Sequence, residues 1–256
     1  MEFGYIVAGF VVGLLVGLTG VGGGSLMTPI LVLFFHIKPA LAVGTDLLYA
    51  SVTKSVGIFA HGKLGNIDWK IVRLLALGSV PASIFTTINL KHMDIASEAA
   101  VNTIKFWLGI ALLITSLSVL FRTQLAKFSK KEHLVSAEWT PYLTVILGLV
   151  LGALVTLTSV GAGALGVTAL LIIYPKRAIN TIIGSDIAHA VPLTLVAGLG
   201  HASIGTVNYS LLGVLLIGSI PGIWIGSHLS SKVAEHWVRV ALALILIFVG
   251  LKLIFH

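Results

Sequence analysis

Ionisable side chains lie inside long apolar stretches of this sequence, away from water, which makes them candidates for a functional role. Asp46 and Asp186 each follow a hydroxyl residue, Thr45 and Ser185. A carboxylate in a lipid-embedded segment is costly and usually functional. Either aspartate could take up a proton, or a sodium ion with the help of backbone carbonyls. The alternative is that each aspartate caps the first turn of a helix that begins at the hydroxyl residue.

Basic side chains occur in the same stretches. Lys54 lies near the middle of its segment and could supply the counter-charge for a transported anion, pair with Asp186, or extend to the membrane edge. His189 is a candidate for proton handling, because the charge of histidine changes near neutral pH. His61 and His201 end apolar segments, where a histidine suits the helix dipole, so we expect structural roles. No carboxylate or second histidine stands at ligand spacing from them, so we expect no metal site.

Two glycine-rich clusters could bind an anion through the backbone. The first runs Thr19-Gly-Val-Gly-Gly-Gly-Ser25, and the second, poorer in glycine, covers residues 158–164. Each glycine costs a helix about 1 kcal/mol relative to alanine, so the first cluster breaks a helix. The freed backbone groups must face protein or a cavity, and a helix that begins there points its N–H groups at an anion. Close helix packing through small residues is the alternative. The predicted substrate-binding residues are Thr19, Gly20, Gly22, Gly23, Gly24, Ser25, Thr45, Lys54, Ser159, Gly161, Gly163 and Ser185.

A stripe of small residues accompanies a proline late in the chain. Gly218 and Gly222 are four residues apart with Pro221 between them, and Pro81 occupies the corresponding place in the first half. Small residues at this spacing favour close helix packing. The prolines should kink their helices, which leaves a hinge for alternating access as the other interpretation.

The elements that carry these residues are arranged as one unit that occurs twice. Residues 44–81 return as residues 184–221 at a constant offset of 140, and the glycine clusters correspond at an offset of 139. Doubled hydrophobic units are typical of transporters. We predict a membrane repeat over 1–121, a hydrophilic linker over 122–140 and a second membrane repeat over 141–256. The ten apolar segments are roughly 3–19, 25–35, 40–61, 67–90, 99–121, 141–158, 164–174, 178–200, 208–228 and 236–255.

Composition places these segments in a membrane. The chain is 57% hydrophobic and 10% charged, whereas a soluble domain carries about 25% charged residues. Apolar runs of about 20 residues span a bilayer as helices, and these runs lack the alternation of a β-barrel. The predicted fold class is therefore an all-α polytopic membrane protein with about 8–10 membrane helical segments. The net charge of +7 fits loops that meet anionic headgroups, so we expect the lipid bilayer as a partner and no nucleic acid.

Loop charges predict how the two copies are oriented. The second segment of each copy is too short to cross a bilayer, so the first two segments form either a hairpin or a single broken crossing. With hairpins, eleven lysines and arginines gather on one face and three on the other. With broken crossings, the split is eight against six. The positive-inside rule favours the hairpins, which invert one copy relative to the other. Both termini are then outside and the linker is cytoplasmic.

The order, spacing and duplication of these motifs resemble the TauE/SafE family of membrane anion transporters over nearly the whole chain. The likeness lies in the first glycine cluster followed by Pro29, residues 42–45, the loop 61–69 and the repeated Gly-Ser-x-Pro segment. It implies a secondary transporter in a prokaryotic cytoplasmic membrane, commonly an exporter, for sulfur-containing anions such as sulfite or organosulfonates. Two features depart from the pattern: Asp46 replaces a small polar residue, and Ala162 and Ala164 dilute the second glycine cluster.

The sequence thus predicts a transporter rather than an enzyme. A small anion would be held near the midplane and moved by alternating access, with no cofactor and with protons coupled through Asp46, Asp186 or His189. No HExxH, GxSxG or paired-carboxylate spacing supports an intramembrane enzyme. A passive anion channel and a transporter of a non-sulfur anion are the alternatives. The oligomeric state is left open, a homodimer included.

Overall fold

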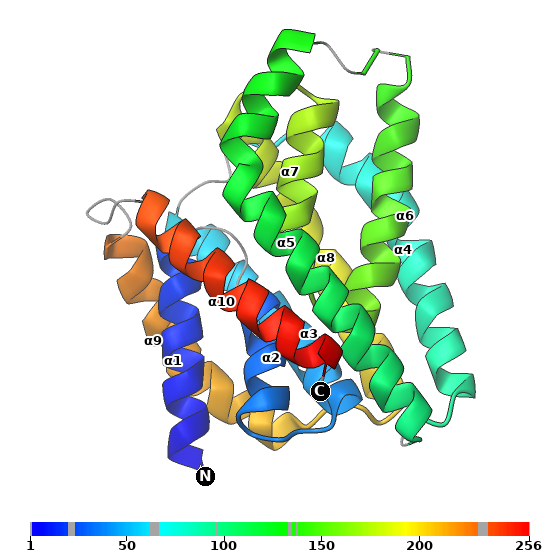
Figure 1. Ribbon diagram of the computed structural model, residues 1–256, viewed down its shortest axis with the longest axis vertical. Coiled ribbons are helices and arrows are strands. Elements are labelled where there is room, and N and C mark those ends of the chain that lie inside the picture. Colours follow the sequence, from blue (N-terminus) through cyan, green and yellow to red (C-terminus); the bar gives the residue numbers. More distant parts are fainter. Residues whose placement is uncertain are drawn as a thin grey trace.

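The computed structural model describes residues 2–19, 24–61, 67–95, 97–132, 135–136, 138–229 and 235–255. Over these residues the chain forms ten helices and no strand (Figure 1), which confirms the predicted all-α fold. Nine helices begin and end within three residues of the predicted segments, but α5 continues through the hydrophilic stretch to Glu132. The helices are α1 (Glu2–Thr19), α2 (Gly24–Leu33), α3 (Pro39–His61), α4 (Trp69–His92), α5 (Glu98–Glu132), α6 (Thr140–Thr158), α7 (Ala164–Ile173), α8 (Ile179–Ser203), α9 (Tyr209–Leu229) and α10 (Glu235–Phe255).

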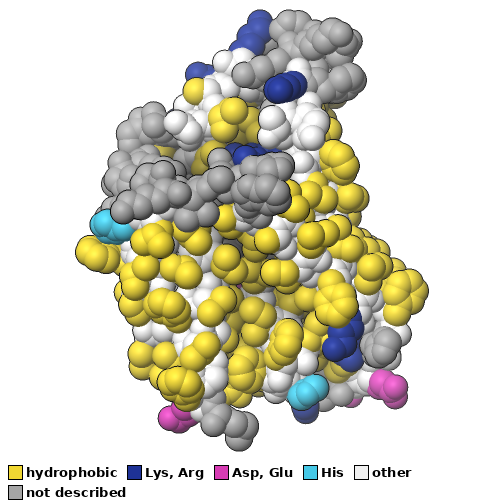
Figure 2. All heavy atoms as spheres, turned by 60° about the vertical axis from the view of Figure 1, so that its left-hand side comes forward, with side chains coloured by type: hydrophobic (Ala, Val, Ile, Leu, Met, Phe, Trp, Pro, Cys, Tyr) yellow, Lys and Arg dark blue, Asp and Glu magenta, His cyan; other side chains and the backbone are white. Residues whose placement is uncertain are grey.

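The outer surface is that of a protein embedded in lipid. Six helices in the described part of the chain are long and apolar enough to cross a bilayer: α4, residues 98–125 of α5, α6, α8, α9 and residues 238–255 of α10. Large apolar side chains such as Phe85 and Phe248 are exposed on them. In Figure 2 hydrophobic side chains cover a broad middle zone, and most visible charged side chains gather toward the two ends. Exposed Trp69, Trp139 and Tyr209 stand at helix starts, where aromatic rings suit the membrane–water interface.

The short helices α2 and α7 turn back along the helices that precede them. The hydroxyls of Thr144 near the start of α6 and Tyr174 at the end of α7 are 2.8 Å apart. In the first copy the rings of Tyr5 and Phe35 take the corresponding positions, with centroids 4.5 Å apart. The chain therefore returns to the end from which it set out, so α1–α2 and α6–α7 are hairpins rather than continuous broken helices.

Each copy packs its first helix on the fourth helix of the other copy. α1 lies parallel to α9 and α6 lies parallel to α4 (Figure 1). A Cβ atom on Gly13 would collide with the carbonyl oxygen of Ser219, and one on Gly152 would collide with that of Ser79. These contacts correspond at the offsets of the sequence repeat. Glycine is needed here because the two backbones touch.

The third and fifth helices pair with their own counterparts in the other copy. Gly44 and Leu48 of α3 meet His201 and Gly198 of α8, so these two helices run antiparallel. The hydroxyl of Ser51 lies 3.5 Å from the carbonyl oxygen of Val191, its own counterpart. α5 and α10 also cross antiparallel, with Gly109 against the end of α10. The pairing of equivalent residues marks where an axis relating the copies would pass.

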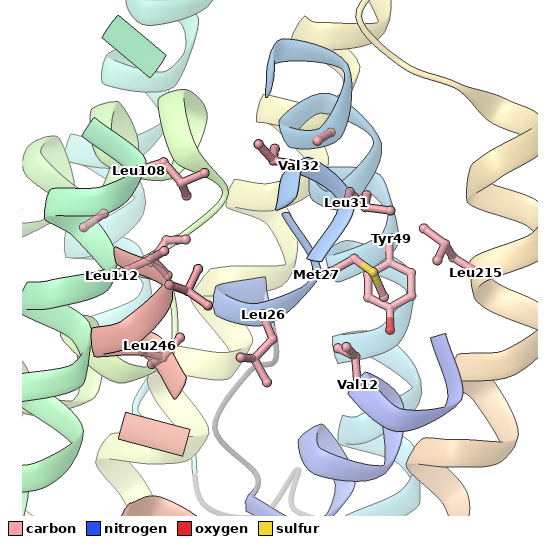
Figure 3. Packing of buried hydrophobic residues seen from close by; sticks show 14 of the residues in the cluster. Val12, Leu26, Met27, Leu31, Val32, Tyr49, Leu108, Leu112, Leu215 and Leu246 are labelled. Atoms are coloured by element: carbon pink, nitrogen blue, oxygen red, sulfur yellow. The ribbon is translucent and has the colours of Figure 1, made fainter. Parts of the chain in front are cut away.

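An apolar core fixes α2 between these helices. Met27 and Leu31 of α2 are buried against Tyr49 of α3 and Leu215 of α9 (Figure 3). On its other side α2 leaves a cavity of about 500 Å³ against α10, lined by Leu26 and Phe248 among others. The equivalent pair in the other half is packed, and Thr168 of α7 bonds to the carbonyl of Ser118 on α5 over 3.4 Å. The two halves are therefore alike in topology but not in packing.

Candidate functional site between α3, α8 and the break after α6

The two central helices bring the predicted ionisable residues into the interior of the protein. Asp46 and Lys54 lie on α3, Asp186 and His189 lie on α8, and none is more than 5% exposed. α3 begins at Pro39 and α8 at Ile179, so each aspartate lies seven residues inside its helix. The aspartates therefore do not cap the first turns of their helices, and the burial of their charges needs another reason.

Lys54 reaches from α3 into the break between α6 and α7. Its ammonium group donates a hydrogen bond to the carbonyl oxygen of Ala162 over 3.1 Å. The side chain lies within electrostatic range of Asp186 and Asp46, the influence of Asp186 being the larger. Lys54 makes no ion pair within 4 Å with a described carboxylate. It is a buried cation held by a backbone dipole between two separated anions.

Asp186 lies within electrostatic range of one cation on each of two other helices. The charges of Lys54 on α3 and Arg122 on α5 both act on it, and it faces the backbone of Gly163. A Cβ atom on Gly166 would collide with its carboxylate, so glycine at that position lets α7 pack on Asp186 without displacing the side chain. Arg122 is 8% exposed. Sequence reasoning missed this residue because it stands where the hydrophilic stretch begins. Its position directly after an apolar run was the one available signal.

Asp46 has hydrogen-bond donors that Asp186 lacks. It accepts hydrogen bonds from the backbone N–H of Thr28 at 3.1 Å and from the Thr28 hydroxyl at 2.6 Å. At the repeat offset the counterpart of Thr28 is Val167, which has no hydroxyl. The Ser159 side chain also lies beside Asp46. The two carboxylates are therefore equivalent in the repeat but different in environment, and Thr28 is a second residue that sequence reasoning missed.

His189 extends from α8 to α4. Its Nε2 atom lies 2.7 Å from the hydroxyl of Ser79. In the other half of the molecule Tyr49 occupies the place of His189, beside Ser219, the counterpart of Ser79. The pair of His189 and Ser79 and the pair of Tyr49 and Ser219 thus occupy equivalent places in the two copies but differ in their chemistry. His189 also lies within electrostatic range of Lys54.

The hydroxyls of Thr45 and Ser185 point to loops rather than to the charged residues. Thr45 accepts a hydrogen bond from the backbone N–H of Asn208 at 3.0 Å, and Ser185 accepts one from that of Asp68 at 2.8 Å. Asn208 and Asp68 in turn cap α9 and α4 through the N–H groups of Leu211 and Lys70. This geometry gives both hydroxyls an anchoring role that the sequence did not reveal.

The second glycine cluster forms a buried, non-helical turn. Ser159 has φ of 59°, and Gly161 and Gly163 have φ of 119° and 121°, values that favour glycine. The turn is buried, as expected for freed backbone groups. α7 begins at Ala164 and directs its positive end toward this turn. In the first cluster Gly24 begins α2, whereas Gly20, Gly22, Gly23 and the side chains of Thr19 and Ser25 lie outside the described residues.

The remaining predicted residues have structural contacts. His201 bonds through Nδ1 to the Thr206 hydroxyl at 2.8 Å and through Nε2 to the Thr156 carbonyl at 2.9 Å. Gly218 and Gly222 pack on the backbone of α1, and α4 and α9 remain helical through Pro81 and Pro221. The side chain of His61 lies outside the described residues. Within the described ranges no three histidine, aspartate or glutamate side chains gather as a metal ion would require.

Buried opposite charges around a helix break are typical of membrane transporters, and similarity to known proteins places the chain in that class. Residues 5–253 match the sequence model of the family described as "Sulfite exporter TauE/SafE", so this chain belongs to that family. It is 40% identical to the probable membrane transporter protein YjnA of Bacillus subtilis, over 99% of this chain and all of that protein. It is 28% identical to the probable membrane transporter protein MJ0441 of Methanocaldococcus jannaschii, over 96% of this chain and 92% of that protein. No solved structure matches it significantly.

Proposed function

We propose that this transporter moves small sulfur-containing anions, such as sulfite or organosulfonates, out of the cell by proton-coupled alternating access. The observation that carries the proposal is the buried ammonium group of Lys54 at the turn between α6 and α7. A cation beside the positive end of α7 is a favourable place for an oxyanion. The family description supports sulfur as the central atom, because it names sulfite export.

Charge balance supports the coupling to protons. Lys54 and Arg122 carry two positive charges, and Asp46 and Asp186 carry two negative charges, all buried in the same region. A monovalent anion that enters leaves one uncompensated negative charge in an apolar interior, which is costly. Protonation of Asp186 or Asp46 would restore neutrality, and the anion would then balance the charge of Lys54. The expected stoichiometry is one proton for each negative charge of the substrate.

The packing of the helices supports an inverted arrangement of two membrane repeats, 1–121 and 141–256. Equivalent helices that run antiparallel, as α3 and α8 do, are what an axis in the membrane plane would produce. With the positive-inside rule, this arrangement leaves both termini outside and the linker in the cytoplasm. Alternating access then follows when one repeat rocks against the other around the central charges.

Flux measurements in proteoliposomes test this function. Sulfite, sulfoacetate, thiosulfate, sulfate, taurine and acetate are offered with and without a pH gradient to the wild type, Asp46→Asn and Asp186→Asn. We expect saturable flux of a sulfur oxyanion that a pH gradient drives and that each substitution uncouples. Full activity with unchanged pH dependence in both variants would contradict proton coupling through these aspartates. Flux that does not saturate would indicate a passive channel, and preference for acetate would indicate a carboxylate transporter.

A further inference from the structure

A mixed polar and apolar cavity opens between α5 and α10, and it is lined by none of the charged residues described above. Its volume is about 470 Å³, and its polar lining comprises Thr123, Gln124, Lys127 and Arg239. Phe121 and Val240 belong to its apolar lining. No aspartate or glutamate is among the described residues that line it. The cavity therefore combines two cations and two neutral polar groups with an apolar wall.

The depth of the cavity matches the headgroup level of one leaflet. The apolar run of α5 ends at Phe121, and that of α10 begins at Val238. Arg239 therefore lies at the end of its run, and Lys127 lies six residues beyond the end of the other run. Phe121 is 49% exposed on the outer surface of the protein. The cationic end of the cavity thus lies at the membrane surface and the apolar end lies in the hydrocarbon region.

We propose that this cavity binds an anionic phospholipid, with its phosphate between Lys127 and Arg239 and its acyl chains against Phe121 and Val240. A phospholipid has an anionic headgroup followed by hydrocarbon chains, which is the same order as the cationic end and the apolar end of the cavity. Basic cavities between membrane helices bind such headgroups, and each lysine or arginine near the surface strengthens binding about fivefold. A free phosphate carries the same anionic group but has no hydrocarbon chains that could contact the apolar wall. The proposal does not depend on which anion the protein transports.

The test uses full-length protein purified in detergent and stripped of lipid, without any transport substrate. Phosphatidylglycerol and phosphatidylcholine with the same acyl chains are added, and bound lipid is counted by native mass spectrometry. Thermal unfolding is followed in parallel, because a ligand that binds only the folded protein raises Tm. Glycerol 3-phosphate and inorganic phosphate form the arm without acyl chains. The variants are Lys127→Gln, Arg239→Gln and the double variant.

The matched control is the double variant Lys70→Gln/Arg73→Gln, which removes two exposed basic residues from the first turns of α4. We expect the preference for phosphatidylglycerol over phosphatidylcholine to fall about fivefold in each single variant and about 30-fold in the double variant, but to persist in the control. Equal lipid preference in Lys127→Gln and wild type would overturn the proposal, and this exposed position decides the matter if Arg239→Gln fails to fold. Equal stabilisation by inorganic phosphate, or an equal loss in the control, would also overturn it.

Discussion

Lys54 on α3 and Ala162 after α6 are 108 residues apart in the sequence, but the ammonium group of the first donates a hydrogen bond to the carbonyl oxygen of the second over 3.1 Å. The contact joins the two repeats at the point where α6 ends. A buried ammonium group has three donors, so the carbonyl leaves further hydrogen-bonding capacity that an anion can use. Under the proposed function, Lys54 is the residue whose positive charge would attract the substrate anion to the break after α6.

Replacement of Lys54 tests that role directly. Lys54→Ala removes the cation, and because hydrogen bonds to charged groups contribute about 1.5–3 kcal/mol, we expect anion affinity to fall about 10- to 100-fold. The measurement is the rise in Tm with each sulfur anion in detergent. Lys252→Ala, near the end of α10, removes the same charge away from the break and should bind as the wild type does. A Lys54→Ala protein with unchanged affinity would place the anion elsewhere.

The α1–α9 contact predicts opposite effects for two glycine substitutions. A Cβ on Gly13 would collide with the backbone of Ser219, so Gly13→Ala must push the helices apart and should destabilise the protein by about 1–3 kcal/mol. Gly213, on α9, has open space around its Cβ position. Gly213→Ala should be neutral or stabilise by up to about 1 kcal/mol, since alanine favours helix. Thermal unfolding of both variants in one detergent compares them, and equal Tm values would contradict the close contact.

The hydroxyls of Thr45 and Ser185 predict a loss of stability when they are removed. Thr45→Val removes the acceptor of the partly buried hydrogen bond from the N–H of Asn208, and Ser185→Ala does the same for the N–H of Asp68. A hydrogen bond of this kind contributes about 0.5–1.5 kcal/mol. We therefore expect a lower Tm for both variants, while the concentration of anion that gives half-maximal stabilisation stays unchanged. Normal stability with weakened anion binding would instead support the direct substrate role that the sequence suggested.

The absence of cysteine makes the proposed topology measurable. Lys91 at the end of α4 and Lys176 after α7 are both exposed. The Asp68–Arg177 ion pair joins the loop after α7 to the start of α4, so the 24-residue length of α4 separates the two sites. In intact cells a membrane-impermeant maleimide should label Lys91→Cys, and it should label Lys176→Cys only after permeabilisation. The wild type, which has no cysteine, is the control that should not be labelled. Labelling of both variants from one side would contradict the hairpin arrangement.

Local patterns in the sequence predicted most of the helices, because each apolar run has a clear beginning and end. The exception is α5, in which Lys127 and its neighbours continue a helix beyond the bilayer, where polar residues no longer signal a helix end. Partners across the molecule could not be predicted. The stripe of small residues at Gly218 predicts a close helix contact but does not indicate that α1 is the partner. Likewise nothing local to Asp46 points to Thr28, because that hydrogen bond exists only after α2 has folded back.

The exchange of helices between the two repeats has a consequence for the order in which this protein is made. Gly9 and Gly13 of α1 pack on Leu215 and Ser219, which lie about 200 residues later in the chain. At a synthesis rate of roughly 5–20 residues per second, α1 waits about 10–40 s in the membrane before its neighbour exists. During that time the insertion machinery, surrounding lipids or another chain must shield its glycine-lined surface. Protein quality control therefore has a long interval in which an unfinished copy of this transporter can be recognised and removed.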